Sequence, residues 1–392
     1  MSTFFSRRDS LRWLGAAAAT ATLGAGPARL AFAAPSLAGG ADERRLVVVM
    51  LRGALDGLAA VPAVGDPGWA TLRGQADADA AANVAAPLPL DATFALHPAL
   101  TSLHQWFMQK ELLVVHATAS GYRERSHFDA QQMLESGGER PYALTTGWLG
   151  RALQASRQSA MAMTASMPLA LRGGDASSTW TPSRGAGNDQ DLLARVAQMY
   201  SGDAALHTAF THAMGQQDMA KGAKGGPGFA SLTKQAGVFL SEAKGPRVAW
   251  LEVGGWDTHN AQTGRLQRLL GELDLGLAAL RAALGEHWAH TTVLVMTEFG
   301  RTAAYNGTNG TDHGTGSVAF VAGGDVAGGR VHTDWPGLSR ASLLDGRDLK
   351  PTLDIRAVLA PSLQRQFGLS TAALQSSVFP GLTGRGLDVW RS

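Results

Sequence analysis

Cysteine is absent from this sequence of 392 residues. The chain therefore has no disulfide framework, and thiolate chemistry is excluded from any site that it builds. An excess of one charge is also lacking, because 34 Lys and Arg residues face 32 Asp and Glu residues, a formal net charge of +2. No basic run with interleaved aromatic residues is present, so the sequence argues against a nucleic-acid partner.

Glycine, by contrast, is abundant, with 48 residues that follow no fixed period. This pattern indicates many turns and loop-built sites rather than a fibrous protein. Hydrophobic residues make up 45% of the chain and charged residues 17%, an ordinary globular composition. The length suits one large α/β domain or two smaller ones.

The first residues have the order of an export signal. Ser6–Arg12 contains an arginine pair typical of twin-arginine signals, a weakly apolar segment spans Gly15–Gly26, and Ala31-Phe32-Ala33 is a small-x-small cleavage pattern. The segment is too short and too rich in alanine for a stable membrane span. The alternative is an amphipathic first helix of the folded domain. We predict a twin-arginine signal peptide over residues 1–33 and a periplasmic or otherwise exported protein of 359 residues (392 − 33).

The remaining chain contains several short valine-rich runs. These runs predict strands that are buried on both faces of a mostly parallel sheet. One long helix, from about Gln262 to Trp288, has leucines at 4-3-4-3-4 spacing and so presents a single apolar stripe. It lies between two of the runs, which predicts a right-handed strand–helix–strand unit. The predicted strands are Arg45–Leu51, Leu112–Val115, Val248–Val253, Thr292–Thr297 and Val318–Ala322.

Polar clusters follow these strands. Asp257 and His259 follow one of the strands flanking the long helix, and Glu298 and Arg301 follow the other. Because parallel strands of one such unit end at the same edge of a sheet, these side chains should lie near one another, where α/β proteins bind ligands. Further candidates for the same edge are Asp56, Asp312 and His313.

Carboxylates with imidazoles are the donors that Zn²⁺ or Mn²⁺ prefers. We therefore predict a site for one or two divalent ions, with Arg301 beside it as a catalytic residue. The alternative is that these side chains order the loops by hydrogen bonds, with a salt bridge between Glu298 and Arg301. Asp56 alone is equally typical of a turn or a helix N-cap. The group Asp345-Gly346-Arg347-Asp348 is typical of a turn.

Ser126 precedes a predicted helix that runs to about Glu135. A serine at this position is often a plain N-cap. The free N–H groups and the dipole of a helix start would also suit a nucleophile that handles an anionic group. Arg123, Arg125 and His127 add positive charge there.

Several segments together resemble an exported bacterial family, domain-of-unknown-function family 1501, within the alkaline phosphatase and sulfatase superfamily. In order they are LRGALDGL, HPAL, RSHFDAQ, GGWDTH, TEFGR and TDHG. The resemblance implies a three-layer α/β sandwich with helices on both faces of a mostly parallel sheet, two divalent metals, and a hydroxyl or modified cysteine nucleophile.

By this resemblance Asp56 is similar to the metal-binding aspartate after the first strand, and Ser126 takes the position of a nucleophile or a metal-bound hydroxyl. Asp257 and His259 resemble the Asp/His ligand pair, Glu298 the acid at a strand end, and His313 the late histidine ligand. Two positions depart from the superfamily pattern. Only Thr258 separates Asp257 from His259, and Phe299 occupies the place of an imidazole.

The sequence thus predicts one alkaline-phosphatase-like domain over residues 34–392, with a mainly helical insertion or cap around residues 173–245. The first functional hypothesis is an exported metal-dependent hydrolase acting on phosphate or sulfate esters of small or polymeric substrates. The second is a non-catalytic binding or assembly protein of the cell envelope on the same scaffold. The expected partners are an ester substrate and the twin-arginine export machinery, with no nucleic acid.

Overall fold

The structure is a computed structural model, and it describes residues 44–74, 85–182, 190–203, 207, 210, 211, 214, 228–384 and 386–391. The predicted signal peptide, residues 1–33, lies outside the described residues. Within the described part of the chain, no helix combines the length and the apolar character needed to cross a bilayer.

A nine-stranded sheet forms the centre, in the order β10-β4-β9-β8-β1-β7-β5-β6, with β11 also paired to β4. All pairings are parallel except those of β9, which runs antiparallel to β4 and β8. The strands are β1 (Arg45–Leu51), β4 (Leu112–Ala119), β5 (Ala160–Ala162), β6 (Ser177–Thr179), β7 (Val248–Val253), β8 (Thr291–Thr297), β9 (Ser317–Ala322), β10 (Arg330–His332) and β11 (Leu353–Asp354).

Strand β1 lies in the middle of the sheet, hydrogen-bonded to β7 on one side and β8 on the other. Every residue of β1 is buried, as its continuous apolar sequence predicts for a strand covered on both faces. Helix α11 (Gln262–Leu284) connects β7 to β8, so the carboxyl ends of three parallel strands meet at one edge. The 3₁₀ turn η2 (Gly285–His290) follows α11.

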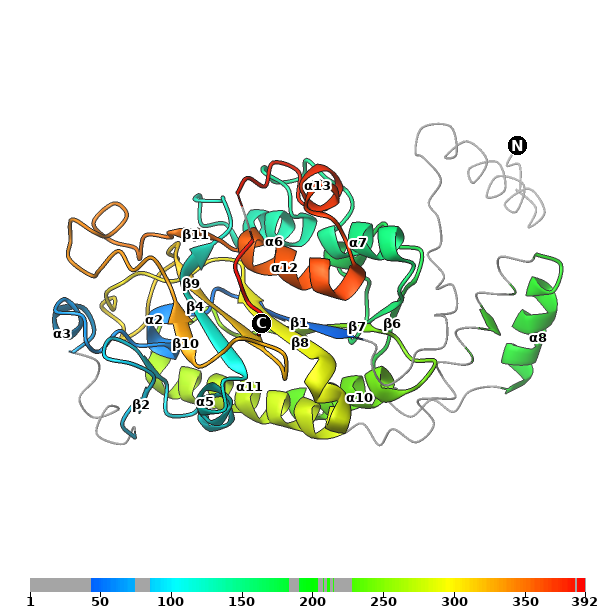
Figure 1. Ribbon diagram of the computed structural model, residues 1–392, viewed down its shortest axis with the longest axis horizontal. Helices are drawn as coiled ribbons and strands as arrows, with labels where there is room; N and C mark the ends of the chain where they lie inside the picture. Colours follow the sequence, from blue (N-terminus) through cyan, green and yellow to red (C-terminus); the bar gives the residue numbers. More distant parts are fainter. Residues whose placement is uncertain are drawn as a thin grey trace, which may run out of the picture. The chain divides into compact units, whose positions relative to one another are not determined.

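Helices cover both faces of the sheet (Figure 1). One hydrophobic cluster packs α5, α10 and α11 against the first face, and another packs α6, α7 and α12 against the second. The leucine stripe of α11 points into the first cluster, with each leucine at most 2% exposed. The helices are α5 (Thr101–Met108), α6 (His127–Ser136), α7 (Trp148–Ser156), α10 (Phe229–Ser241) and α12 (Arg356–Phe367).

The fold class is therefore the predicted three-layer α/β sandwich with a mostly parallel sheet. Helix α10 falls within the predicted insertion around residues 173–245, but it packs against α11 and belongs to a layer of the sandwich. The remaining short elements are α2 (Gly57–Ala60), α3 (Trp69–Arg73), β2 (Leu88–Pro89), β3 (Ala95–Leu96), η1 (Leu169–Leu171), α8 (Gln190–Tyr200), α13 (Thr371–Ala373) and η3 (Leu374–Val378).

The α11 stripe allows a matched test of this packing. Leu273 is fully buried, whereas Leu275 on the same helix is 65% exposed. We expect Leu273→Ala to lower the free energy of unfolding by about 2–5 kcal/mol, because it leaves a cavity in the core. The control Leu275→Ala should change it by no more than about 0.5 kcal/mol. Urea unfolding followed by circular dichroism measures both, and equal losses would contradict the packing of α11.

Candidate metal centre

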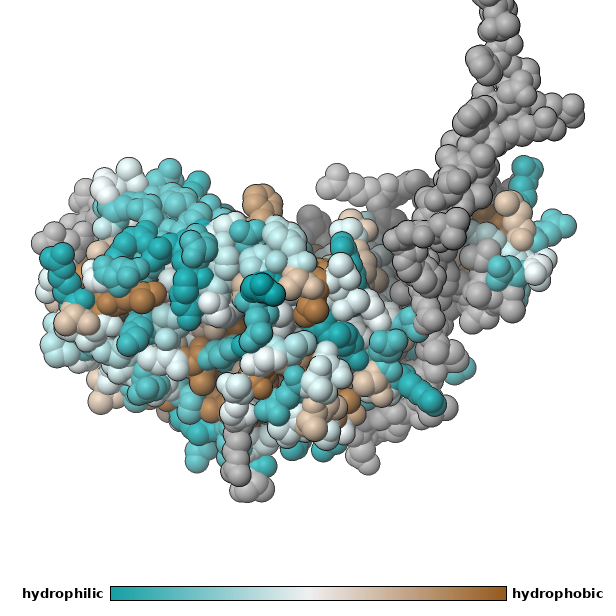
Figure 2. All heavy atoms as spheres, turned by 90° about the horizontal axis from the view of Figure 1, so that it is seen from above, coloured by the Kyte–Doolittle hydropathy of each residue, from teal (hydrophilic) through white to brown (hydrophobic). Residues whose placement is uncertain are grey.

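Three segments converge beyond the carboxyl ends of the central strands. Helix α6 begins with His127, the loop after β7 carries Asp257 and His259, and the loop before β9 carries His313. Seen from above, the described surface is largely hydrophilic, with scattered hydrophobic residues (Figure 2). Side chains from positions up to 186 residues apart thus share one site.

The Nε2 atoms of three histidines meet around one carboxylate. His313 Nε2 lies 3.0 Å from His127 Nε2 and 3.1 Å from His259 Nε2. Asp257 Oδ1 lies 2.9 Å from His259 Nε2 and 3.2 Å from His313 Nε2, and Asp257 Oδ2 lies 3.6 Å from His127 Nε2. His127, Asp257 and His313 therefore surround one common space, and His259 adjoins it.

The other ring nitrogen of each histidine faces a hydrogen-bond acceptor, which sets the tautomer. A carboxylate or a carbonyl accepts but cannot donate, so each Nδ1 must carry the proton and each Nε2 is a bare lone pair in the neutral ring. The Nδ1···O distances are 2.8 Å for His127 to Glu298, 3.1 Å for His259 to Asp312, and 3.0 Å for His313 to the Arg125 carbonyl.

Bare lone pairs at about 3 Å repel one another and the Asp257 carboxylate unless a cation lies among them. A proton on His127 Nε2 satisfies its contact with His313, but the contact between His259 and His313 still joins two acceptors. A tetrahedral ion with metal–ligand bonds of about 2.0–2.1 Å spaces its ligand atoms about 3.3 Å apart, close to the separations found here. Imidazoles and a carboxylate suit Zn²⁺ or a related divalent ion. The donor set fits a metal.

Among the described residues, His127, Asp257 and His313 form the group whose ligand atoms all lie within 4.8 Å of one another. His259 adjoins this group through His313 and Asp257. The side chains of Asp257 and His259 are 43% and 44% exposed, so the centre opens to solvent. Asp257, His259 and His313 were predicted ligands, and the structure brings all three together.

Glu298 was predicted as a ligand, but the structure places it behind His127. Its Oε1 accepts hydrogen bonds from His127 Nδ1, from Gln131 Nε2 (2.9 Å) and from Gly53 N (2.8 Å). Burial works to raise the pKa of Glu298, but the hydrogen bonds from His127 and Gln131 outweigh it and hold the pKa below its ordinary value. Glu298 is thus an ionised, fully buried carboxylate that orients His127.

Asp312 has the same relation to His259, whose Nδ1 it accepts at 3.1 Å. Hydrogen bonds from Asn306 and His259 lower the pKa of Asp312, so it too is ionised. Arg301, predicted at the site, is buried and holds the ligand Asp257 by an ion pair of 2.5 Å, and it also donates to Thr311. These residues position ligands. The alternative of a salt bridge between Glu298 and Arg301 is wrong, because Arg301 pairs with Asp257 instead.

Asp56 is not part of this group. Its two oxygens accept from Arg73 at 2.8 and 3.0 Å, and Gln262 donates to one of them at 2.6 Å. Asp56 also caps α2 by accepting from Ala59 N. It is 1% exposed, so the ion pair with Arg73 compensates a charge that has left water. Asp56 is therefore the N-cap of α2, as the alternative interpretation held, and it is not placed to bind the metal.

Ser126 occupies the N-cap position of α6, but its side chain makes no capping hydrogen bond. It interacts instead with Tyr122, whose hydroxyl donates to Asp129 at 3.0 Å. Ser126 directly precedes His127 in the chain. The Ser126 hydroxyl therefore does not cap α6.

Sequence reasoning assigned His127 only a positive charge and missed it as a ligand. One signal was available, because His127 and Gln131 are four residues apart and therefore share a face of α6. A second signal is Phe299, which stands in the place of an imidazole. Its ring stacks on that of His127, with centroids 4.9 Å apart, so the imidazole is supplied by α6 instead.

A family model described as "Protein of unknown function (DUF1501)" matches residues 43–378, and the chain belongs to this family. Among the curated proteins, no relative matches the sequence.

Similar solved structures include a 2-O GAG sulfatase, at 10% identity and a TM-score of 0.44 over 84% of this chain and 71% of that one. Another is a putative sulfatase from Bacteroides thetaiotaomicron, at 11% and 0.42 over 89% and 76%. A third is the lipoteichoic acid synthase LtaP from Listeria monocytogenes, at 11% and 0.37 over 85% and 74%. The chain spans 66% of a further solved chain. All these identities and TM-scores are low.

Replacing His127 tests the ligand set. We expect His127→Ala to weaken Zn²⁺ or Mn²⁺ binding at least tenfold, because losing a ligand should cost no less than the roughly 10- to 100-fold found for the groups that orient ligands. The control is His290→Ala, at the opposite end of β8, which should bind as the wild type does. Isothermal titration calorimetry of the metal-free proteins measures both. Unchanged affinity in a folded His127→Ala protein would remove His127 from the site.

Protons should compete with the metal. The hydrogen bond to Glu298 raises the pKa of His127, against the smaller opposing effect of burial. Below that raised pKa the metal must displace a proton, so affinity should increase as the pH rises and level off only above it. Glu298→Gln removes the carboxylate, and the midpoint of this rise should move to lower pH. Calorimetric titrations between pH 5 and 8 test this, and identical midpoints for the two proteins would contradict it.

Proposed function

We propose that this member of the family is an exported, metal-dependent hydrolase that acts on phosphate or sulfate esters. The convergence of three imidazole Nε2 atoms on the Asp257 carboxylate is the observation that carries the proposal. Each imidazole is held in the ligating tautomer by an acceptor on its far side. A bound divalent ion would withdraw electron density from the ester and so favour attack on its phosphorus or sulfur.

The surroundings support turnover rather than a closed structural site. Structural metal sites are shut off from solvent, whereas catalytic ones keep a position open. Here Asp257 and His259 are more than two-fifths exposed. The first turn of α6 also directs its N–H groups toward this end of the helix, which favours an anionic group.

Ser126 is the proposed nucleophile. Its interaction with Tyr122, and the hydrogen bond from Tyr122 to Asp129, form a short path for a proton. Ser126 Oγ would form the bond to phosphorus or sulfur, its proton would pass to Tyr122, and the Tyr122 proton to Asp129. The alcohol would leave with a proton from solvent as the ester bond breaks. Water would then release the inorganic anion and restore the serine.

The donor set is that of one ion. Asp56 and Glu298, which a second ion would need, are committed to Arg73 and to His127. We therefore propose a single Zn²⁺ or Mn²⁺, with the charge of the anionic ester balanced in part by the helix start and by nearby arginines.

One observation favours the second hypothesis, a non-catalytic binding protein. If His259 binds the ion together with His127, Asp257 and His313, four protein ligands fill a tetrahedral shell. Turnover would then require one ligand to leave or the ion to accept a fifth. This alternative predicts tight metal binding without hydrolysis.

Export by the twin-arginine route remains part of the proposal, motivated by the order of Arg7-Arg8, apolar segment and Ala31-Phe32-Ala33. N-terminal sequencing of the exported protein should begin at Ala34, and an exported chain that begins at Met1 would contradict cleavage.

Hydrolysis is tested with metal-loaded protein on matched aryl phosphate and aryl sulfate esters. We expect release of the phenol with one of the two, loss of the rate after chelation, and its return when metal is restored. Asp257→Asn and Ser126→Ala should each lower kcat at least 100-fold with the fold retained.

The two variants separate the hypotheses. Metal binding with no hydrolysis of either ester would favour the binding protein. Hydrolysis that survives in Ser126→Ala would leave the metal role in place but remove the serine. Protein that binds no divalent ion while fully folded would end the proposal.

A further inference from the structure

The loop at residues 340–349 approaches the metal centre, although the sequence indicated only a turn there. Arg347 Nη2 donates to the backbone carbonyl of His313 at 2.9 Å. Arg347 Nη1 lies 3.1 Å from Asp348 Oδ1. The Arg347 side chain remains 41% exposed, so a cationic group stands in solvent directly beside a metal ligand.

The backbone holds Arg347 firmly in this place. Its carbonyl accepts from Ala303 N at 3.0 Å, and its N–H donates to the Leu344 carbonyl at 3.1 Å. Asp348 forms isolated bridges with Leu344 and Thr302. The preceding Asp345 has a φ of +54°, a left-handed conformation that costs free energy in a residue with a side chain. A strained, tightly bonded turn therefore carries an exposed arginine.

Neither acidic side chain of this turn is paired with Arg347 alone. Asp348 is completely buried and is shared between two guanidinium groups, those of Arg125 and Arg347. Asp345, 69% exposed, pairs with Arg125. One N–H group of the Arg347 guanidinium donates to the His313 carbonyl, and Nη1 lies within ion-pair distance of Asp348, so donors remain for a ligand.

We propose that Arg347 binds the non-bridging oxygens of the substrate, and that it selects a tetrahedral oxyanion over an uncharged carboxylic ester. The inference rests on the proposed function, because it names the substrate group that the metal centre receives. A guanidinium presents paired N–H donors that match two oxygens of a phosphate or sulfate group, and such charge-assisted pairs are strong.

Acidic side chains at the edge of the metal centre oppose the binding of an anion. Asp257 and Asp312 are 43% and 51% exposed and would repel an anion. A divalent ion among the histidines offsets them, so the metal and Arg347 should act together. We expect inorganic phosphate or sulfate to bind the metal-loaded protein more tightly than the metal-free protein.

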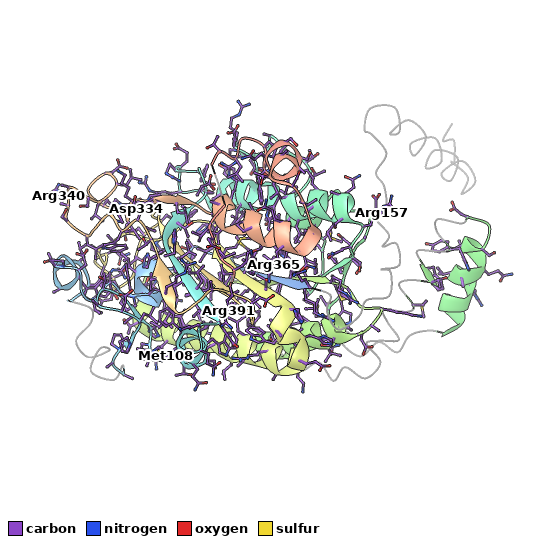
Figure 3. All side chains as sticks on the ribbon, in the orientation of Figure 1. Met108, Arg157, Asp334, Arg340, Arg365 and Arg391 are labelled. Carbon is purple, nitrogen blue, oxygen red and sulfur yellow. The ribbon has the colours of Figure 1, made fainter. Side chains whose placement is uncertain are left out.

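Four proteins test the assignment: the wild type, Arg347→Met, Arg347→Lys and the control Arg340→Met. Arg340 belongs to the same loop region but is exposed, at its outer edge (Figure 3). Each is titrated by calorimetry first with the metal ion and then, in both metal-loaded and metal-free form, with inorganic phosphate and with sulfate. Circular dichroism confirms that each is folded.

We expect Arg347→Met to weaken binding of the preferred anion roughly 10- to 100-fold, as for loss of a hydrogen bond to a charged group. Arg347→Lys should restore part of the affinity, because a lysine keeps the charge but not the paired donors. Arg340→Met should bind as the wild type does. In Arg347→Met, affinity for the metal should change far less than affinity for the anion, whereas a general loss of structure would lower both.

The inference is overturned if Arg347→Met binds phosphate and sulfate as tightly as the wild type does, or if the wild type binds neither anion. Failure of the proposed function has a different signature. A protein that binds no metal, or that hydrolyses no ester, would still support the assignment of Arg347 if its anion binding fell in Arg347→Met alone.

Discussion

The site depends on electrostatic repulsion between imidazole nitrogens and a carboxylate that the fold brings close together. Acceptors on the far side of His127, His259 and His313 hold the proton of each ring on Nδ1. The bare Nε2 atoms of His127 and His259 then both face that of His313, beside Asp257. Such an arrangement is unfavourable without a cation, so the fold must hold it in place from outside. Buried Glu298 and Arg301 provide much of that restraint. Glu298 accepts from Gly53 N, 245 residues away, and Arg301 donates to Thr311 in the loop before β9.

The sequence predicted the edge of the sheet at which this happens, because the evidence for it is local. Continuous apolar runs mark β1, β7, β8 and β9, and the leucine spacing marks α11, so the places where polar residues leave the sheet follow directly. The exact role of each carboxylate is not local. Glu298 becomes an orienting group through His127, 171 residues away, and Asp56 becomes half of an ion pair through Arg73. No pattern around either residue contains that information.

Phe299 shows how the local sequence pattern alone can mislead. In the sequence it removes an imidazole expected beside the strand-end acid, which weakens the case for a metal. In the structure His127 enters from α6, packs on the Phe299 ring and takes its hydrogen bond from the neighbouring Glu298. The imidazole beside this carboxylate thus comes from another element, α6. A departure at one position is therefore informative only together with the residues that fold against it.

Asp56 and Asp257 both follow central strands, yet they differ in solvent exposure, in hydrogen-bond partners and therefore in role. Asp56 is buried against Arg73, whereas Asp257 is open and available to an ion. Hydrogen bonds nevertheless connect them, because Gln262 joins Asp56 to Thr311, and Thr311 accepts from the arginine that holds Asp257. The position of a ligand thus depends on a core ion pair. Because a metal would bind only the folded arrangement, its binding free energy would also stabilise that core.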